Sequence, residues 1–124
     1  MAEKVDWEPF RELAQRALRD GTRLDLTDDE RALLLRTAQE VAIRDAAEAL
    51  ATDSGTRELV AECSRRIKEG SWRLMRALHR MYRHQEKGDF DNARQEMRDV
   101  LAAEVVPYYR QLAQEQLEDM DDAP

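Results

Sequence analysis

Residues 57–87 read RELVAECSRRIKEGSWRLMRALHRMYRHQEK, a run of 31 residues without proline. Its apolar side chains recur three, four or seven positions apart, a spacing that gathers them on one side of a helix. They are Val60, Cys63, Ile67, Leu74, Leu78 and Met81, with Gly70 on the same line. The segment therefore predicts one long helix, from about Arg57 to Lys87, with a side to bury.

The other side of this predicted helix is basic. Five basic residues repeat at alternating intervals of three and four, and we call them the basic line: Arg73, Arg76, Arg80, Arg83 and Lys87. Trp72 lies beside them, about 160° around the helix from Leu74 at 100° per residue. Residues 57–87 hold nine Lys and Arg but four Asp and Glu, although the chain's net charge is −7. The positive charge is thus concentrated on this helix.

Two helices are expected before it. The first runs from about Trp7 to Asp20, where Gly21 supplies a left-handed stop. Thr27 and Glu30 have the spacing of a capping box, which starts a helix that we expect to continue to about Leu50.

One further helix is expected after the long one. It begins at the turn Gly88-Asp89-Phe90 and is kinked near Pro107, because proline removes a helical hydrogen bond. Residues 77–107 resemble one tetratricopeptide-type helical hairpin, since Ala93 follows the aromatic of the turn by three residues. The sequence departs from that family where bulky Met81 replaces a small residue. We expect residues 119–124 to form a disordered acidic tail.

The composition favours a packed bundle over a disordered chain. Of the 124 residues, 38% are charged, but the 42% that are hydrophobic recur at helical spacing. This length suits one hydrophobic core. We therefore predict an all-α fold: a single helical domain over residues 1–124, built as a bundle of about four helices.

The chain has no apolar run long enough to cross a bilayer. Its first residues, MAEKVDWEPF, lack the plan of a signal peptide, so we expect a cytoplasmic protein with no membrane contact. The negative net charge also argues against nucleic acid as a partner, although this average conceals the local basic line.

Groups that could carry chemistry are few. His79 and His84 lie about 140° apart on a helix and cannot bind one metal ion together. Cys63 could be a reactive thiol beside Arg65 and Arg66, but its place among apolar residues favours core packing. Met75, Met81 and Met97 are likewise interpreted as packing residues. We therefore expect no catalytic residue, no metal, no cofactor and no enzymatic activity.

Two interpretations of the basic line stay open. It can be a solvated face whose arginines pair with acidic residues of the same chain. It can also be a docking surface in which Trp72, Arg73, Arg76, Arg80, Arg83 and Lys87 bind a partner, since Trp and Arg are enriched at binding hot spots.

The docking interpretation predicts a helical protein-interaction module with a protein partner, and a homodimer is one form of it. One alternative is an acidic inhibitor or immunity-type protein that neutralises a toxin or a basic enzyme. A second is nucleic-acid binding through the same helix.

Nearly the whole chain resembles the DUSAM domain family, a group of small paralogous myxobacterial proteins of unknown function. The resemblance rests on Val5-Asp6-Trp7, on residues 26–36, on Leu78-His79-Arg80-Met81-Tyr82, on residues 88–94 and on residues 105–110. It implies a single domain and brings no activity, cofactor or catalytic residue.

Overall fold

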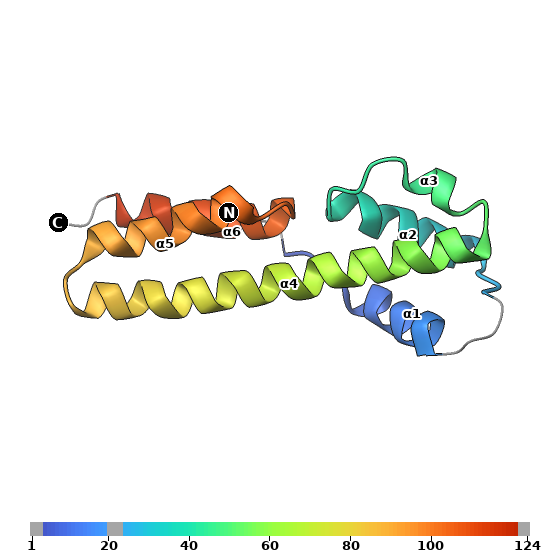
Figure 1. Cartoon of the computed structure of the whole chain (residues 1–124), viewed down its shortest axis with the longest axis horizontal. Helices are drawn as coiled ribbons and strands as arrows, with labels where there is room; N and C mark the ends of the chain where they lie inside the picture. Colours follow the sequence, from blue (N-terminus) through green and yellow to red (C-terminus); the bar gives the residue numbers. More distant parts are fainter. Residues whose placement is uncertain (1–3, 20–23, 122–124) are drawn as a thin grey trace. The chain divides into compact units, whose positions relative to one another are not determined.

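The structure is a computed structural model that describes residues 4–19 and 24–121. Every regular element in those ranges is a helix, so the all-α prediction is confirmed (Figure 1). The helices are α1 (Glu8–Arg19), α2 (Asp28–Glu40), α3 (Ala46–Ala49), α4 (Asp53–Glu86), α5 (Phe90–Ala103) and α6 (Pro107–Met120). None of these described helices combines the length and hydrophobicity that a membrane crossing requires.

The chain divides into two compact units. The N-terminal unit is Val5–Ile67, and the C-terminal unit is formed mainly by the residues from Lys68 onward. Helix α4 supplies its first part to one unit and its second part to the other. The expectation of a single domain over residues 1–124 stays a prediction.

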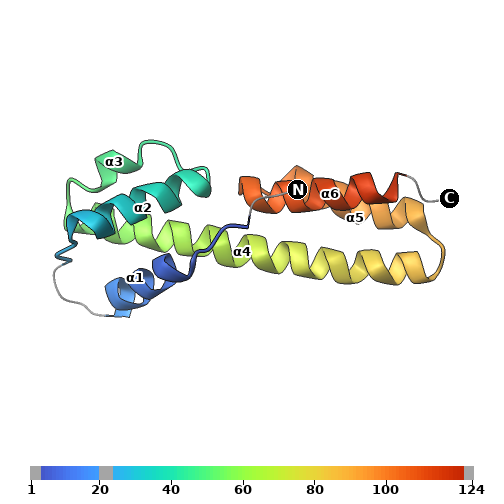
Figure 2. The same ribbon diagram turned by 180° about the vertical axis from the view of Figure 1, so that it is seen from behind.

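In the N-terminal unit, α1, α2 and α3 lie around the first part of α4 (Figure 2). The core contains Phe10, Leu34, Val60 and Cys63, each at most 1% exposed. Polar contacts fix the helix ends to one another. The indole Nε1 of Trp7, for example, donates a hydrogen bond to Glu40 Oε1 at 3.2 Å.

The helix expected to run from the capping box to about Leu50 is shorter than predicted. The capping box of Thr27 and Glu30 is present, but α2 ends at Glu40. Ala42 then adopts the left-handed conformation, with φ 65°, and the Ile43 N–H donates to the Ala38 carbonyl at 2.9 Å. This is the hydrogen-bond pattern with which helices usually end at glycine. The sequence prediction was wrong because the stop residue is alanine.

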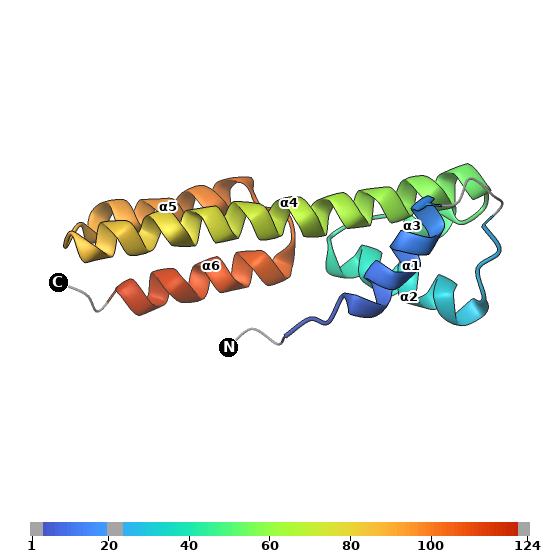
Figure 3. The same cartoon turned by 90° about the horizontal axis from the view of Figure 1, so that it is seen from below.

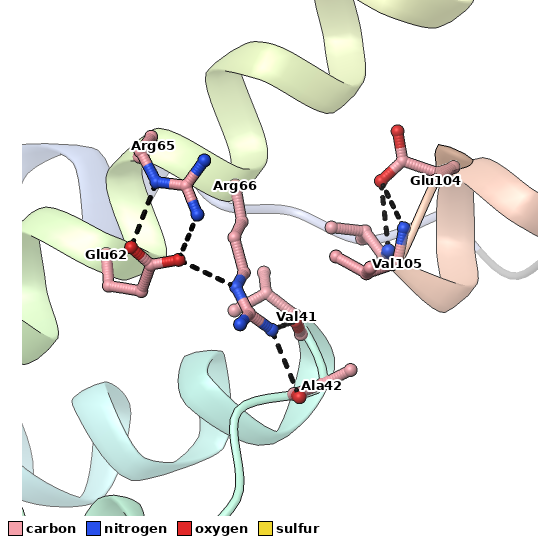
Figure 4. A network of polar contacts seen from close by, with 8 residues as sticks. Val41, Ala42, Glu62, Arg65, Arg66, Glu104 and Val105 are labelled. Atoms are coloured by element: carbon pink, nitrogen blue, oxygen red, sulfur yellow. Dashed lines mark hydrogen bonds and ion pairs between the residues drawn. The ribbon is translucent and has the colours of Figure 1, made fainter. Parts of the chain in front are cut away.

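A contact from α4 holds this unusual helix end. Arg66 Nη1 donates to the carbonyl oxygens of Val41 and Ala42 at 3.0 and 3.1 Å (Figure 4). Glu62 fixes Arg66 in turn, accepting from its Nε at 2.9 Å. The hydrogen bond from Arg65 is the main reason why the pKa of Glu62 falls to about 2. Long-range pairing thus supplies what the local sequence lacks.

In the C-terminal unit, α5 and α6 lie along the second part of α4 (Figure 3). Helix α4 ends with the same pattern as α2, but here glycine takes the left-handed position: Gly88 has φ 74°. The Asp89 N–H donates to the His84 carbonyl at 2.8 Å. The Asp89 side chain then accepts from the Asn92 N–H at 3.2 Å and caps α5.

The last predicted helix is two helices instead of one kinked helix. Helix α5 ends at Ala103, and Pro107 is the first residue of α6. Proline suits that position because its missing N–H would have no partner there. Together with the early end of α2, this break raises the count in the described residues to six helices instead of about four. The likeness to a tetratricopeptide hairpin stays a prediction.

The residues expected to form a disordered tail are partly helical. Helix α6 includes Asp119 and Met120, and Met120 is 2% exposed. Residues 122–124 lie outside the described ranges.

The two similar helix ends predict opposite effects of exchanging alanine and glycine. Ala42→Gly should stabilise the protein by about 0.5–1 kcal/mol. Glycine removes the strain of the left-handed conformation, and the greater conformational entropy of the unfolded chain offsets only part of this gain. Gly88→Ala should destabilise it by about 0.5–1 kcal/mol, since a methyl group there meets nothing within 4 Å and adds only backbone strain. Denaturant unfolding measures both changes; two changes of the same sign would contradict this account.

Candidate functional site

The second part of α4 has an inner side that packs and an outer side that does not. The inner side is formed by four buried residues, Gly70, Leu74, Ala77 and Met81. At Gly70 the packing is so close that a Cβ atom would lie 2.4 Å from the ring of Tyr109 in α6. This contact, together with the buried residues, fixes which side of α4 faces outward.

Four residues with partly apolar side chains follow one another along the outer side, and we call them the outer row: Trp72, Met75, His79 and Tyr82. Trp72 is 59% exposed, Met75 60% and Tyr82 51%. Isolated exposed apolar residues are ordinary, whereas several that adjoin on one helix form a candidate interaction surface. The interpretation of Met75 as a packing residue was wrong.

Two members of the basic line are engaged by acidic residues of the same unit. Arg73 Nη1 donates to Glu104 Oε1 at 2.7 Å, and the Glu104 side chain is only 1% exposed. Arg80 Nε donates to Glu96 Oε1 at 2.8 Å. These two arginines therefore hold α4 to the chain that follows it, as the solvated-face interpretation predicted for the whole line.

The three other members project from the surface. Arg76, Arg83 and Lys87 are exposed. Within the described part of the chain, Arg76 and Arg83 form no hydrogen bond or ion pair with an acidic side chain. They lie next to the outer row because positions 76 and 83 are within about 40° of Trp72 around the helix. The surface available to a partner thus combines an indole with guanidinium groups.

The outer row is bordered by a hollow on each side. One, of about 500 Å³, is lined by Lys68, Glu69, Trp72, Arg73, Arg76 and Arg80. The other, of about 530 Å³, lies between α4 and α6, and Met75, Leu78, Tyr82, Tyr108 and Leu112 are among the residues that line it. The first is basic and the second is mainly apolar. Both are open, so they suit a partner's side chains better than an enclosed small molecule.

Buried Glu104 fixes the position of Arg73, which lies beside this surface. Its Oε2 accepts from the backbone N–H groups of Val105 and Val106 at 3.1 and 2.9 Å (Figure 4). Its Oε1 accepts from Arg73. A buried carboxylate is tolerated only when it is paired and hydrogen-bonded. Glu104 thereby ties α4 to the start of α6.

Cys63, the only cysteine, is buried and belongs to the core of the N-terminal unit. Burial raises the pKa of its thiol to about 12, against the smaller opposite effect of Arg66. The core interpretation of Cys63 is therefore confirmed, and the reactive-thiol interpretation is wrong.

His79 and His84 point to different surroundings. His79 is exposed in the outer row, whereas His84 Nε2 lies 3.4 Å from Glu96 Oε2. Among the described residues, no three His, Cys, Asp or Glu side chains are grouped as a metal ion would require.

The sequence identified part of this surface and missed the rest. The spacing of Trp72, Arg76, Arg83 and Lys87 put them on the side of the helix away from the apolar seam, and the structure shows that all four are exposed. Met75, His79 and Tyr82 were missed, although their spacing from Trp72 could have revealed them. Arg73 and Arg80 could not be separated from the others because their acidic partners lie far away in the sequence.

Comparison with known proteins places the chain in a family. Residues 5–120 match the family model described as Protein of unknown function (DUF2379). The chain belongs to this family. No curated protein and no solved structure matches it.

Membership in the DUF2379 family agrees with the expectation of an uncharacterised family that spans nearly the whole chain. The more specific resemblance to the DUSAM domain family stays a prediction. The description of the DUF2379 family assigns no activity, so its members' function has to be argued from surfaces such as the outer side of α4.

Arg73 and Arg76 form a matched pair for testing the Glu104 contact. Arg73→Ala leaves a buried carboxylate without its cation and should destabilise the protein by about 2–3 kcal/mol. Arg76→Ala, three residues away on the same helix, should change stability by less than about 0.5 kcal/mol. Urea unfolding measures both, and equal effects would show that the Arg73 contact contributes nothing.

The raised pKa of Cys63 predicts slow alkylation. At pH 8 a thiol of pKa about 12 is almost entirely protonated, so iodoacetamide should react with the folded protein at least about a hundredfold more slowly than with the unfolded chain. Mass spectrometry of timed samples measures the rate. Labelling of folded protein at the unfolded rate would place the thiol outside the core.

Proposed function

We propose that the protein is a non-catalytic helical interaction module that binds a protein partner through the outer side of α4. The observation that carries the proposal is the outer row itself: Trp72, Met75 and Tyr82 are each more than half exposed on one helix. Arg76 and Arg83 stand beside them without an acidic partner among the described residues.

Covering such a surface with a partner lowers the free energy of the protein. Burying apolar side chains removes unfavourable hydration. Tryptophan, tyrosine and arginine are the side chains that most often dominate binding energy. Trp72, Tyr82 and Arg83 bring all three types together on a helix whose inner side is packed. A partner can therefore bind without unfolding or rearranging the C-terminal unit.

The proposed absence of catalysis is supported by how the reactive side chains are used. Cys63 is a buried thiol with a raised pKa. The carboxylates of Glu62, Glu96 and Glu104 each pair with arginines and fix one helix to another or one turn to the next. These side chains therefore stabilise the fold, which supports a non-catalytic role.

The engagement of Arg73 and Arg80 favours a protein partner over nucleic acid. A phosphate backbone is recognised mainly by the number of cations presented to it. Two of the five members of the basic line are already paired with Glu104 and Glu96. The remaining surface is as apolar as it is basic, and this suits a protein surface.

A comparative pull-down from native cell lysate tests the proposal. The tagged protein should retain a partner that the double variant Trp72→Ala, Tyr82→Ala retains at least tenfold less, since hot-spot truncation has effects of that size or larger. Quantitative mass spectrometry compares the variants, and thermal unfolding checks that both are folded.

Arg98→Ala is the control, because Arg98 is exposed on α5 and does not belong to the outer side of α4. This variant should retain the partner as well as the unchanged protein does. Retention that is the same for all three proteins would contradict the proposal.

A further inference from the structure

We propose that the partner is a second copy of this chain, bound with its α4 antiparallel along the outer row. The inference rests on the proposed function and names its partner. It is carried by the order of side chains on the outer side of α4, which complements itself in one orientation only.

The outer row is part of a longer regular series. Lys68 precedes Trp72 by four positions, and Glu86 follows Tyr82 by four positions. The spacing from Lys68 to Glu86 is therefore four, three, four, three and four, which is the spacing at which helices pair along a seam. All six residues of the series are exposed. Helix α4 thus has a second seam, on the side away from its core.

The two ends of this seam carry opposite charges. In an antiparallel pair, positions 68 and 86 meet, so Lys68 faces Glu86 of the second copy at both ends. Positions 72 and 82 also meet, and Trp72 then packs on Tyr82 of the second copy. In a parallel pair, Lys68 would face Lys68 and Glu86 would face Glu86. Charge therefore selects the antiparallel orientation.

The flanks of the seam agree with the same arrangement. On one flank, Ser71, Leu78 and Gln85 are uncharged, and Leu78 would meet Leu78 of the second copy. On the other flank, Arg83 comes opposite Glu69, while Arg76 meets Arg76 at the midpoint. Only this central contact is repulsive.

The self-complementary order distinguishes a second copy from a foreign acidic helix. An acidic helix would satisfy Arg76 and Arg83, but it would gain nothing from a seam that ends in Glu86. A symmetric pair uses both ends of the seam and both aromatic residues. It also gives Arg76 a role that can be tested, because a foreign acidic partner would be held by Arg76 and a second copy is weakened by it.

Sedimentation velocity of the full chain over a range of concentrations tests the inference. The protein should show a reversible monomer–dimer equilibrium. Trp72→Ala should raise the dimer dissociation constant at least tenfold. Arg98→Ala should leave it unchanged, and Arg76→Gln should lower it severalfold by removing the central repulsion.

Charge reversal tests the orientation. Lys68→Glu alone and Glu86→Lys alone should each weaken the dimer, because each places like charges at both ends of the seam. The double variant should restore the original dissociation constant, since it exchanges the two charges and keeps their pairing. In a parallel dimer the exchange would leave like charges facing each other, so a double variant that behaves like the two single variants would overturn the inference.

A protein that stays monomeric at every concentration would also overturn it, as would a dimer that Trp72→Ala leaves intact. The proposed function is judged separately by the pull-down. A monomeric protein that loses a different partner when Trp72 and Tyr82 are replaced would refute self-association and leave the interaction module standing.

Discussion

The C-terminal unit depends on one buried carboxylate. Glu104 is almost completely buried, and a charge in that position must be matched by donors from its surroundings. It finds them in Arg73 of α4 and in the backbone at Val105 and Val106, just before α6 begins. The Glu104 side chain thus lies where α5 ends, binds the backbone just before α6 and connects both helices to α4.

This constraint explains why the outer side of α4 is uncovered. Helix α5 runs back along the inner side of α4, and α6 then reverses direction and follows the same side (Figure 3). Glu104 and the close contact at Gly70 hold them there. The outer row then has no covering element within its own unit. Because these exposed side chains do not pack within their own unit, they are candidates for contact with a partner.

The sequence predicts elements whose signals are local and misses contacts that are not. The long helix α4, the capping box at Thr27 and the turn at Gly88 each follow from a few neighbouring residues. The end of α2 does not, because Ala42 carries no stop signal and Arg66 reaches its carbonyl group from α4.

In the candidate site, too, the features that follow from local spacing can be predicted and the contacts with distant residues cannot. Periodicity places Trp72 and Arg76 on the side opposite the apolar seam, and only the structure shows that this side is exposed. The spacing of Met75 and Tyr82 also predicts that they lie on this side, but methionine is more often a core residue and Met75 was therefore interpreted as packed. Arg73 is paired with Glu104, which lies 31 positions away in the sequence. A local sequence pattern cannot predict a contact over that separation.

The absence of a side chain at Gly70 has a consequence for how this sequence can change. The aromatic ring of Tyr109 occupies the space that any Cβ atom at position 70 would need. A methyl group can therefore be accepted there only if position 109 becomes smaller or the two helices separate. Positions 70 and 109 are expected to vary as a linked pair among natural relatives, so that a larger residue at one is accompanied by a smaller residue at the other.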